Sequence, residues 1–250
     1  MKNYLFPFLK NERAFFLAYD HGFEHGPSDF REKNSDPEYI LDLAVKGRFT
    51  GIILQKGIAE KYYLNSPYQK RVPLILKLNG KTNLLPNEEP YSAVNCSVEY
   101  AKKLGAQAVG YTIYLGSKFE AKMFEDFGQI QEKAHHLEMG AILWAYPKPG
   151  LENDPKITEY AGRIGLELGA DIIKLKYFGD KESFKQAIKL AGKTKVVLSG
   201  GQKLNEEKFL AVASEIMELG ASGVAVGRNI WQSEKPLEIT EKLRQIVLGD

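Results

Sequence analysis

The unit from which this chain is built is visible in the segment Leu168-Gly169-Ala170-Asp171-Ile172-Ile173-Lys174-Leu175-Lys176-Tyr177. Its glycine can adopt the left-handed conformation that ends many helices. The aliphatic run that follows is short and is typical of a strand. The segment therefore predicts one helix-to-strand step of an alternating βαβ arrangement.

The same step recurs along the chain. The tripeptide Leu-Gly-Ala stands before an apolar run three times, at residues 104–106, 168–170 and 219–221. Apolar or β-branched runs predict strands at residues 14–20, 51–55, 74–79, 108–113, 141–146, 172–177, 196–201 and 223–228. Amphipathic stretches predict helices that include residues 36–46, 93–104, 119–138, 155–168, 206–219 and 237–248. Eight strands thus alternate with the helices that connect them.

Eight such units can form either an open doubly wound sheet or a closed barrel. No predicted strand leads into the glycine fingerprint of a dinucleotide-binding sheet, and no low-complexity linker divides the 250 residues. We therefore predict the α/β class, with residues 1–250 forming a single-domain (β/α)₈ barrel. Barrel enzymes place their chemistry at the carboxyl ends of the strands. Polar residues predicted at those ends are Asp20, Gln55, Asn79, Tyr146, Lys174, Lys176, Ser199 and Arg228.

Charge and cysteine content exclude several classes of protein. The 34 basic and 32 acidic residues give a formal net charge of +2 without a long block of one sign, so we expect no nucleic-acid and no membrane partner. Cys96, which we expect within a helix, is the only cysteine, so an internal disulfide is excluded and a reducing compartment is indicated. Residues 1–10 lack the apolar core of a signal peptide. We therefore expect a cytoplasmic protein.

Two lysines share one face of the strand predicted at residues 172–177. Side chains alternate along a strand, so Lys174 and Lys176 point to the same side. Burial among the helices would be costly, and we therefore expect both to face the barrel interior. Two nearby ammonium groups lower each other's pKa, and a neutral amine can attack a carbonyl to form a Schiff base. Alternatively, these lysines pair with interior carboxylates or bind a substrate phosphate.

Two neighbouring strand ends contain glycine. One predicted strand ends in Ser199-Gly200-Gly201, and the next ends in Gly227-Arg228. Glycine lets backbone N–H groups approach phosphate oxygens, and arginine adds a bidentate cationic partner. A single glycine pair would indicate only a turn, but barrels frequently bind phosphate at these two strand ends. The pattern therefore predicts a phosphate site.

Trp144 and Tyr146 share a face at the end of another predicted strand, which Pro147 ends. A phenol beside a lysine-bound intermediate can donate and accept protons, and we expect nearby cations to lower its pKa. The alternative is that the two rings only fill the core. Their place at a strand end favours the catalytic interpretation.

The loop after the first predicted strand concentrates polar side chains, among them Asp20, His21, His25 and Asp29. A buried Asp20 can balance the lysine charge, and the others can bind the distal end of a substrate. A metal site is the alternative, but no second ligand-rich segment completes a coordination shell, so we predict no metal and no cofactor. His135 and His136 lie within a predicted helix, and we expect them to be solvated.

At these residues the chain resembles the archaeal-type class I fructose-bisphosphate aldolases, in the superfamily that includes the DeoC-type aldolases. The matching segments span nearly the whole chain and fall on most of the predicted strands. They are Ala18-Tyr19-Asp20-His21-Gly22, Glu24-His25-Gly26-Pro27, Leu76-Lys77-Leu78-Asn79-Gly80-Lys81-Thr82, Gly110-Tyr111-Thr112-Ile113-Tyr114, Trp144-Ala145-Tyr146-Pro147, Gly169-Ala170-Asp171-Ile172-Ile173-Lys174, Ser199-Gly200-Gly201 and Ala225-Val226-Gly227-Arg228-Asn229.

The resemblance implies a role for each predicted site residue. Lys174 would be the Schiff-base lysine, Tyr146 the proton donor and acceptor, and Asp20 the residue that assists the iminium. Substrate contacts would be made by His21, His25, Asp29, Trp144, Lys148 and Lys176, and the ketose phosphate would be held by Ser199, Gly200, Gly201, Gly227 and Arg228. Two positions depart from the family pattern. Gln202 replaces a usual proline, and Lys148 replaces a common arginine, which removes a planar fork that binds phosphate in a bidentate manner.

The activity implied by the resemblance is metal-independent cleavage of fructose 1,6-bisphosphate in glycolysis and gluconeogenesis, by a homo-oligomer whose partner is a small sugar phosphate. One alternative is a related lysine enzyme that makes an aminodideoxy-heptulosonate or acts on an acylated pentose phosphate; Thr112 and Trp144 favour the aldolase. The other is a non-catalytic sugar-phosphate-binding barrel, against which the joint presence of Lys174 and Tyr146 argues.

Overall fold

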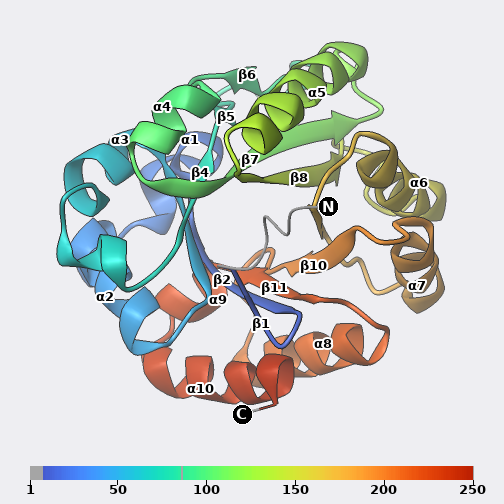
Figure 1. Cartoon of the computed structure of the whole chain (residues 1–250). Coiled ribbons are helices and arrows are strands. Elements are labelled where there is room, and N and C mark those ends of the chain that lie inside the picture. The colour runs from blue at the N-terminus through green and yellow to red at the C-terminus, as the bar shows by residue number, and fades with distance from the viewer. Residues whose placement is uncertain (1–7, 86, 250) are drawn as a thin grey trace.

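Strand β2 (Arg13–Tyr19) pairs in parallel with β3 (Gly51–Gln55) on one side and with β11 (Gly223–Val226) on the other. This double pairing closes eight parallel strands into a ring that helices surround (Figure 1). The other barrel strands are β4 (Leu74–Lys77), β7 (Ala106–Leu115), β8 (Gly140–Pro147), β9 (Ile172–Leu175) and β10 (Lys195–Ser199). The computed structural model describes residues 8–85 and 87–249, and it confirms the predicted (β/α)₈ barrel. The sequence predicts no signal peptide in residues 1–10. Residues 1–7 of that stretch lie outside the described residues.

Helices cover the outside of the barrel, and most of them begin where a short polar side chain caps them. Capping side chains accept a hydrogen bond from a backbone N–H of the first turn, and they are Asp36, Ser97, Asp154, Asp180 and Asn205. The outer helices are α2 (Pro37–Lys46), α4 (Val98–Lys103), α5 (Glu120–His136), α6 (Pro155–Glu167), α7 (Lys181–Leu190), α8 (Glu206–Glu218) and α10 (Pro236–Leu248). None of the described helices is long and apolar enough to cross a membrane.

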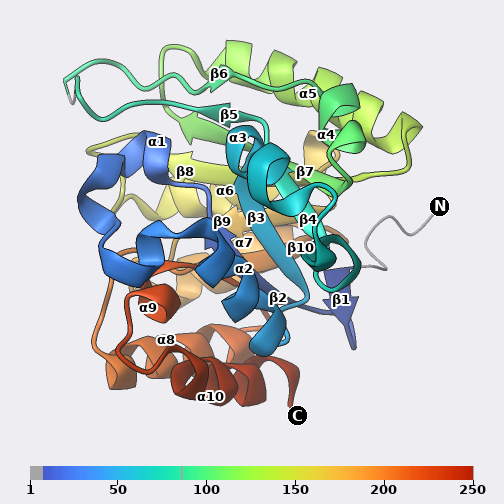
Figure 2. The ribbon, with the colours of Figure 1, turned by 90° about the vertical axis from the view of Figure 1, so that its left-hand side faces the viewer.

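Short elements follow the carboxyl ends of several barrel strands. They are α1 (Gly22–His25), η2 (Gly26–Asp29) and η3 (Glu32–Ser35) after β2, α3 (Lys56–Ile58), η4 (Ala59–Tyr63) and η5 (Pro67–Lys70) after β3, the ribbon of β5 (Asn79–Gly80) and β6 (Ala93–Val94) after β4, and α9 (Arg228–Trp231) after β11. Figure 2 places α1 and α9 at one end of the barrel, and β1 (Leu9–Lys10), which pairs with β2 in antiparallel fashion, at the other. The end with α1 and α9 is called the rim below.

The repeated Leu-Gly-Ala step forms the turn that the sequence predicts. Gly105, Gly169 and Gly220 have φ angles of 84°, 75° and 101°, all in the left-handed region. The alanine after each of them is buried where the chain enters the next strand. Glycine is needed here because a Cβ atom disfavours this backbone conformation.

Some predicted boundaries are wrong. The helix predicted at residues 93–104 begins only at Val98, because the Ser97 hydroxyl accepts a hydrogen bond from the Tyr100 N–H at 3.1 Å and caps the helix there. Cys96 therefore precedes the helix instead of lying in it, and its side chain is buried. The strands predicted to end at residues 177, 201 and 228 end at Leu175, Ser199 and Val226, because residues 176–177 and 200–201 leave the ladder as loops and Arg228 begins α9.

His135 is only partly exposed, because its ring has a partner that its helical position did not suggest. Its Nε2 lies 2.9 Å from Oδ2 of Asp171, and the same oxygen accepts a hydrogen bond from the Ala141 N–H at 2.8 Å. This contact ties α5 to the starts of β8 and β9. His136, the next residue, is exposed. The pairing escaped the sequence analysis because helical periodicity says nothing about a partner on a distant strand.

Gly162 on α6 provides a test of helix packing. A methyl group there would lie 2.2 Å from the carbonyl oxygen of Ala187 on α7, so backbone would have to move. Gly162→Ala should lower the free energy of unfolding by about 1–3 kcal/mol, measured by chemical denaturation. Gly128→Ala on α5 is the matched control, because its Cβ would meet nothing within 4 Å and alanine favours a helix by about 1 kcal/mol. Equal destabilisation by both substitutions would contradict this packing.

Candidate active site

Lys174 on β9 faces the barrel interior, as the sequence predicts. Its side chain is 5% exposed, and its partners in the neighbouring strands are Trp144 and Val197. The Lys174 Nζ lies 5.2 Å from the centre of the Trp144 ring. Lys176 lies just beyond the strand end, with its Nζ 4.8 Å from the centre of the Tyr146 ring. Both ammonium groups therefore approach aromatic rings, whose quadrupole attracts cations.

A third lysine, Lys77 on β4, lies in the same interior, and the sequence analysis assigned it no role. It is 2% exposed, and its Nζ lies 3.7 Å from Oδ2 of Asp20 and 3.8 Å from Oε1 of Glu24. The same Nζ is 5.3 Å from the centre of the Trp144 ring. The sequence could have indicated that Lys77 has partners. A lysine that ends the aliphatic strand Leu74–Lys77 is costly to bury without them.

Burial lowers the pKa of Lys174 to about 8, because the ammonium form loses its hydration. The Asp20 carboxylate opposes this shift, whereas Lys77 adds to it and Lys176 contributes least. The predicted cause, repulsion between Lys174 and Lys176, is therefore a minor one. Lys174 is a buried amine that loses its proton close to neutral pH.

Asp20, the first residue after β2, is buried beside two of these lysines. Burial alone would raise its pKa, but the positive charges of Lys77 and Lys174 outweigh that effect and lower the pKa below its ordinary value. Asp20 is therefore a carboxylate at neutral pH, and it carries the negative charge that the sequence analysis expected beside Lys174.

Tyr146 lies near the end of β8, and its hydroxyl oxygen is 3.1 Å from the Ser199 Oγ on β10. Burial raises the pKa of Tyr146 well above its ordinary value. The predicted lowering by nearby cations is therefore wrong. Burial, aided by the carboxylates of Asp20 and Glu24, disfavours the phenolate more than the hydrogen bond with Ser199 and the charge of Arg228 favour it. Tyr146 is a neutral phenol at neutral pH.

Gly110 on β7 makes room for the Trp144 indole. A Cβ atom at this position would lie 1.9 Å from two carbons of the ring, so the indole rests directly on the glycine backbone. Within the described part of the chain, two of the buried atoms without a hydrogen-bond partner belong to side chains of the interior, namely Trp144 Nε1 and Thr112 Oγ1. Buried polar atoms normally have one. These two atoms are therefore available to a bound molecule, and Thr112 is a candidate contact that was not predicted from the sequence.

Three amide side chains near the rim brace the backbone. Gln55 donates a hydrogen bond to the Asn79 carbonyl oxygen at 3.0 Å, and Asn79 donates one to the Thr112 carbonyl oxygen at 2.9 Å. Asn229 on α9 donates to the Gly200 carbonyl oxygen at 2.7 Å. The predicted strand-end residues Gln55 and Asn79 thus hold loops in place.

His21, His25, Asp29 and Arg228 form a cluster at the rim. The Arg228 Nη1 lies 3.3 Å from Oδ2 of Asp29, and its Nη2 donates a hydrogen bond to the Gly201 carbonyl oxygen at 2.9 Å. Burial lowers the pKa of His21 to about 4, so its 3.5 Å contact with Asp29 is not an ion pair at neutral pH. The His25 ring lies 5.5 Å from the His21 ring, and burial lowers the His25 pKa too. Two neutral imidazoles therefore stand beside a paired arginine.

The glycines after β10 and β11 adopt conformations that other residues would resist. Gly201 has a φ of 63°, and a Cβ on Gly227 would lie 2.6 Å from the Ala18 carbonyl oxygen. The Gly200 N–H donates a hydrogen bond to the Ala225 carbonyl oxygen at 3.1 Å, which joins the two loops. The structure thus brings together the predicted phosphate residues Ser199, Gly200, Gly201, Gly227 and Arg228.

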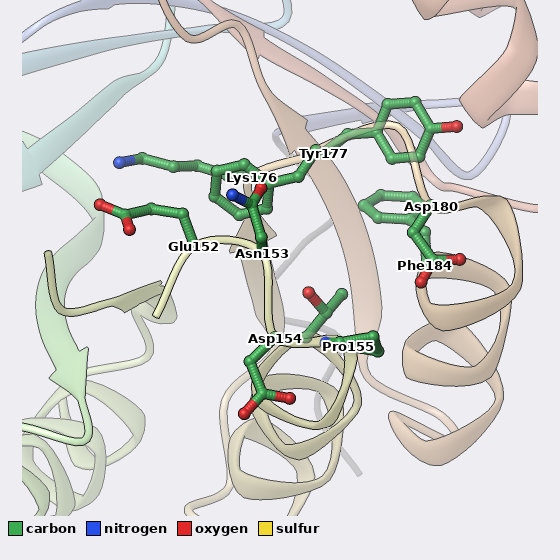
Figure 3. A pocket seen from close by; sticks show the side chains of 10 residues that line it. Glu152, Asn153, Asp154, Pro155, Lys176, Tyr177, Asp180 and Phe184 are labelled. Atoms are coloured by element: carbon green, nitrogen blue, oxygen red, sulfur yellow. The ribbon is translucent and has the colours of Figure 1, made fainter. Parts of the chain in front are cut away.

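Lys148 and Lys176 lie at other parts of the rim. The Lys148 Nζ is 3.0 Å from Oε1 of Glu89, an oxygen that also accepts a hydrogen bond from the Lys118 N–H. Lys176 lines a pocket between the segment before α6 and the segment after β9, and Lys174 does not line it. Figure 3 shows Lys176 and Glu152 extending to the same side of this pocket, away from Phe184.

The polar loop after β2 is not arranged as a metal site. The carboxylates that a metal would require, Asp20 and Glu24, both lie close to the Lys77 ammonium group. In residues 8–85 and 87–249, no group of three or more His, Cys, Asp or Glu side chains is placed to hold an ion.

The chain is similar in sequence and in structure to known aldolases. The family model described as DeoC/LacD family aldolase matches residues 14–233. A class 1 fructose-bisphosphate aldolase of Thermoproteus tenax is 51% identical over 248 residues, which cover 97% of this chain and 92% of that one. One of Halobacterium salinarum is 44% identical over 96% of this chain and 92% of its own. A solved archaeal fructose-1,6-bisphosphate aldolase, with its catalytic lysine bound to the carbinolamine intermediate, matches with a TM-score of 0.92 and 49% identity over 98% of each chain.

The lowered pKa of Lys174 can be measured without any substrate. Acetic anhydride acetylates neutral amines and does not itself titrate, so its rate of reaction at Lys174, normalised to an internal amine standard, should rise with pH and be half-maximal near pH 8, against about 10.4 for an ordinary lysine. Mass spectrometry of the peptide that contains Lys174 gives the extent of reaction at each pH. In the denatured protein the difference from other lysines should vanish. Labelling of folded Lys174 that rises only above about pH 10 would contradict the assignment.

Proposed function

Because this chain belongs to the DeoC/LacD family of aldolases, we propose that it is a class I fructose-1,6-bisphosphate aldolase that uses Lys174 as its Schiff-base nucleophile. The observation that carries the proposal is a lysine buried at the carboxyl end of a barrel strand, with a pKa of about 8 and an ionised Asp20 nearby. The names of its 51% and 44% identical relatives support the same reaction. The products are dihydroxyacetone phosphate and glyceraldehyde 3-phosphate.

The first steps depend on the neutral amine of Lys174. Lowering its pKa from 10.5 to about 8 increases the neutral fraction at pH 7 about 300-fold. The amine attacks the C2 ketone to form a carbinolamine, which loses water and leaves an iminium ion. The iminium restores the positive charge at Lys174, and the Asp20 carboxylate stabilises it. This chemistry requires no metal and no cofactor.

Carbon–carbon cleavage requires that the C4 hydroxyl lose its proton while the electrons of the C3–C4 bond move into the iminium to form an enamine. Tyr146 is the proposed proton carrier. As a neutral phenol it can donate its proton directly to the C4 alkoxide in the condensation direction. In the cleavage direction the Tyr146 oxygen takes the C4 hydroxyl proton as the phenol passes its own proton to Ser199, 3.1 Å away, and the partly exposed Ser199 hydroxyl passes one on to solvent water. Protonation of the enamine at C3 and hydrolysis then release dihydroxyacetone phosphate and the amine.

The two substrate phosphates are assigned to different parts of the rim. Ser199, Gly200, Gly201, Gly227 and Arg228 are proposed to hold the ketose phosphate, with Arg228 exchanging its contact to Asp29 for the phosphate. His21, His25, Asp29, Lys148, Lys176 and Trp144 are proposed to contact the rest of the substrate. Lys148 is paired with Glu89 at 3.0 Å, so it can reach a phosphate only if that ion pair opens or is shared.

Cytoplasmic location, a place in glycolysis and gluconeogenesis, and a homo-oligomeric state are part of this proposal. A lone buried cysteine is compatible with a reducing compartment. Self-association is supported by exposed apolar side chains in the segment between β5 and β6, where Leu84 is 86% exposed and Leu85 is 57% exposed. No nucleic-acid or membrane partner is proposed.

Substitution of the nucleophile tests the proposal directly. Lys174→Met should lower the cleavage of fructose 1,6-bisphosphate, assayed with chelator present, by about three orders of magnitude or more. It should also abolish the adduct that borohydride traps with dihydroxyacetone phosphate. Lys176→Met should retain the adduct. A wild type that forms no adduct, or that loses activity to the chelator, would rule out this mechanism.

The role of Tyr146 predicts a separation of steps. Tyr146→Phe should lower cleavage about 10²–10⁴-fold, because it removes the proton carrier, yet it should leave adduct formation at Lys174 intact. Tyr91→Phe, which removes a phenol in 3.4 Å contact with Asp126, is the matched control and should retain full activity. Steady-state cleavage rates and trapped adduct are measured on the same preparations. Equal loss of both in Tyr146→Phe would show that the phenol is not a step-specific proton carrier.

A further inference from the structure

Lys77 is a buried charge that the mechanism above does not use. It is among the largest side chains that are fully enclosed in the described part of the molecule. Two carboxylates, Asp20 and Glu24, lie within 3.8 Å of its Nζ. An ammonium group buried to this extent is stable only if it is paired, and a hydrophobic residue would fill the same space at less cost.

The interior charges balance only while Lys77 is present. Asp20 and Glu24 bring two negative charges, and Lys77 and Lys174 bring two positive ones. When Lys174 loses its proton in order to react, Lys77 remains as the cation near both carboxylates. Without Lys77, the two carboxylates would lose the cation that lies within 3.8 Å of both, and they would hold the Lys174 proton more tightly, because nearby negative charge favours the ammonium form.

The Trp144 indole lies close to both lysines. Its ring centre lies 5.3 Å from the Lys77 Nζ and 5.2 Å from the Lys174 Nζ. The ring cannot move toward β7, since it rests on the backbone of Gly110. Both ammonium groups thus lie beside one ring, and Gly110 blocks the movement of that ring toward β7.

We propose that Lys77 is a positioning residue that balances the charges of Asp20 and Glu24 and holds both carboxylates in place while Lys174 gives up its proton. Lys77 forms no bond to substrate in this proposal and acts through Asp20 and Lys174. Its consequence for the aldol reaction rests on the proposed function, but its effect on the Lys174 amine does not. The charged and titratable groups that face this cluster are Asp20, His21, Glu24, Lys77, Tyr114, Tyr146, Lys174, Lys176 and Arg228.

The test follows acetic anhydride labelling of Lys174 across pH, as described above for the wild type. In Lys77→Met the pH of half-maximal labelling should rise by at least about one unit, which is a tenfold loss of neutral amine at neutral pH. In Lys77→Met with Glu24→Gln it should fall back toward the wild-type value, because one negative charge is removed with the positive one. A purely structural role would leave the labelling curve where it is and would not respond to Glu24→Gln.

Two further variants control for a failure to fold and for effects outside the site. If Lys77→Met does not fold, the labelling curve of Glu24→Gln is compared with that of Lys77→Met with Glu24→Gln. The pH of half-maximal labelling should be higher in the double variant, because only that variant lacks Lys77. Lys195→Met, which removes a lysine paired with Glu12 outside the site, is the matched control and should leave the curve unchanged. An unchanged curve in folded Lys77→Met, or in the double variant relative to Glu24→Gln, would overturn the proposal.

The borohydride adduct with dihydroxyacetone phosphate separates this inference from the proposed function. If the labelling curve shifts and the wild type forms the adduct, both stand, and the pH dependence of adduct formation should shift in the same direction in Lys77→Met. If the curve shifts but the wild type forms no adduct, the charge balance stands and the aldolase assignment falls.

Discussion

The pairing of β2 with a strand on each side is the constraint on which the rest of this structure depends. A closed ring has no sheet edge, so each barrel strand can be short and wholly buried, as β3 and β4 are. Closure also brings the carboxyl ends of all eight strands to one rim, and it buries the side chains of the interior. In such an interior a charged side chain is stable only beside an opposite charge.

The interior charges therefore behave as one system. Asp20 remains a carboxylate because Lys77 and Lys174 are close, and Lys174 has a pKa of about 8 because burial outweighs the attraction of Asp20. The Trp144 indole, seated on Gly110, keeps the two lysines at similar distances from one ring. Reactivity at Lys174 is thus a property of the enclosed group as a whole, and the rim cluster around Arg228 adds the polar surface that a phosphorylated substrate needs.

Some of the site could be predicted from the sequence because its signals are local. Alternation along one strand put Lys174 on the inner face, and glycines next to Ser199 and Arg228 marked the neighbouring strand ends. The pKa of Tyr146 could not be predicted in this way. Nearby cations suggested a lowered value, whereas burial, which depends on side chains from many segments, raises it. Lys77 was missed for a similar reason, since its partners Asp20 and Glu24 follow a different strand.

By itself, the sequence determined the alternation of eight strands with helices, the left-handed turns at Gly105, Gly169 and Gly220, and the type of chemistry available at the strand ends. These depend on periodicity and on the conformations open to individual residues, which neighbours in the chain largely decide. Only the tertiary structure decided which charges meet, where Lys148 and His135 find their partners, and which groups stay neutral. Coulomb interactions and hydration depend on distance and burial in space, and residues far apart in the chain set both.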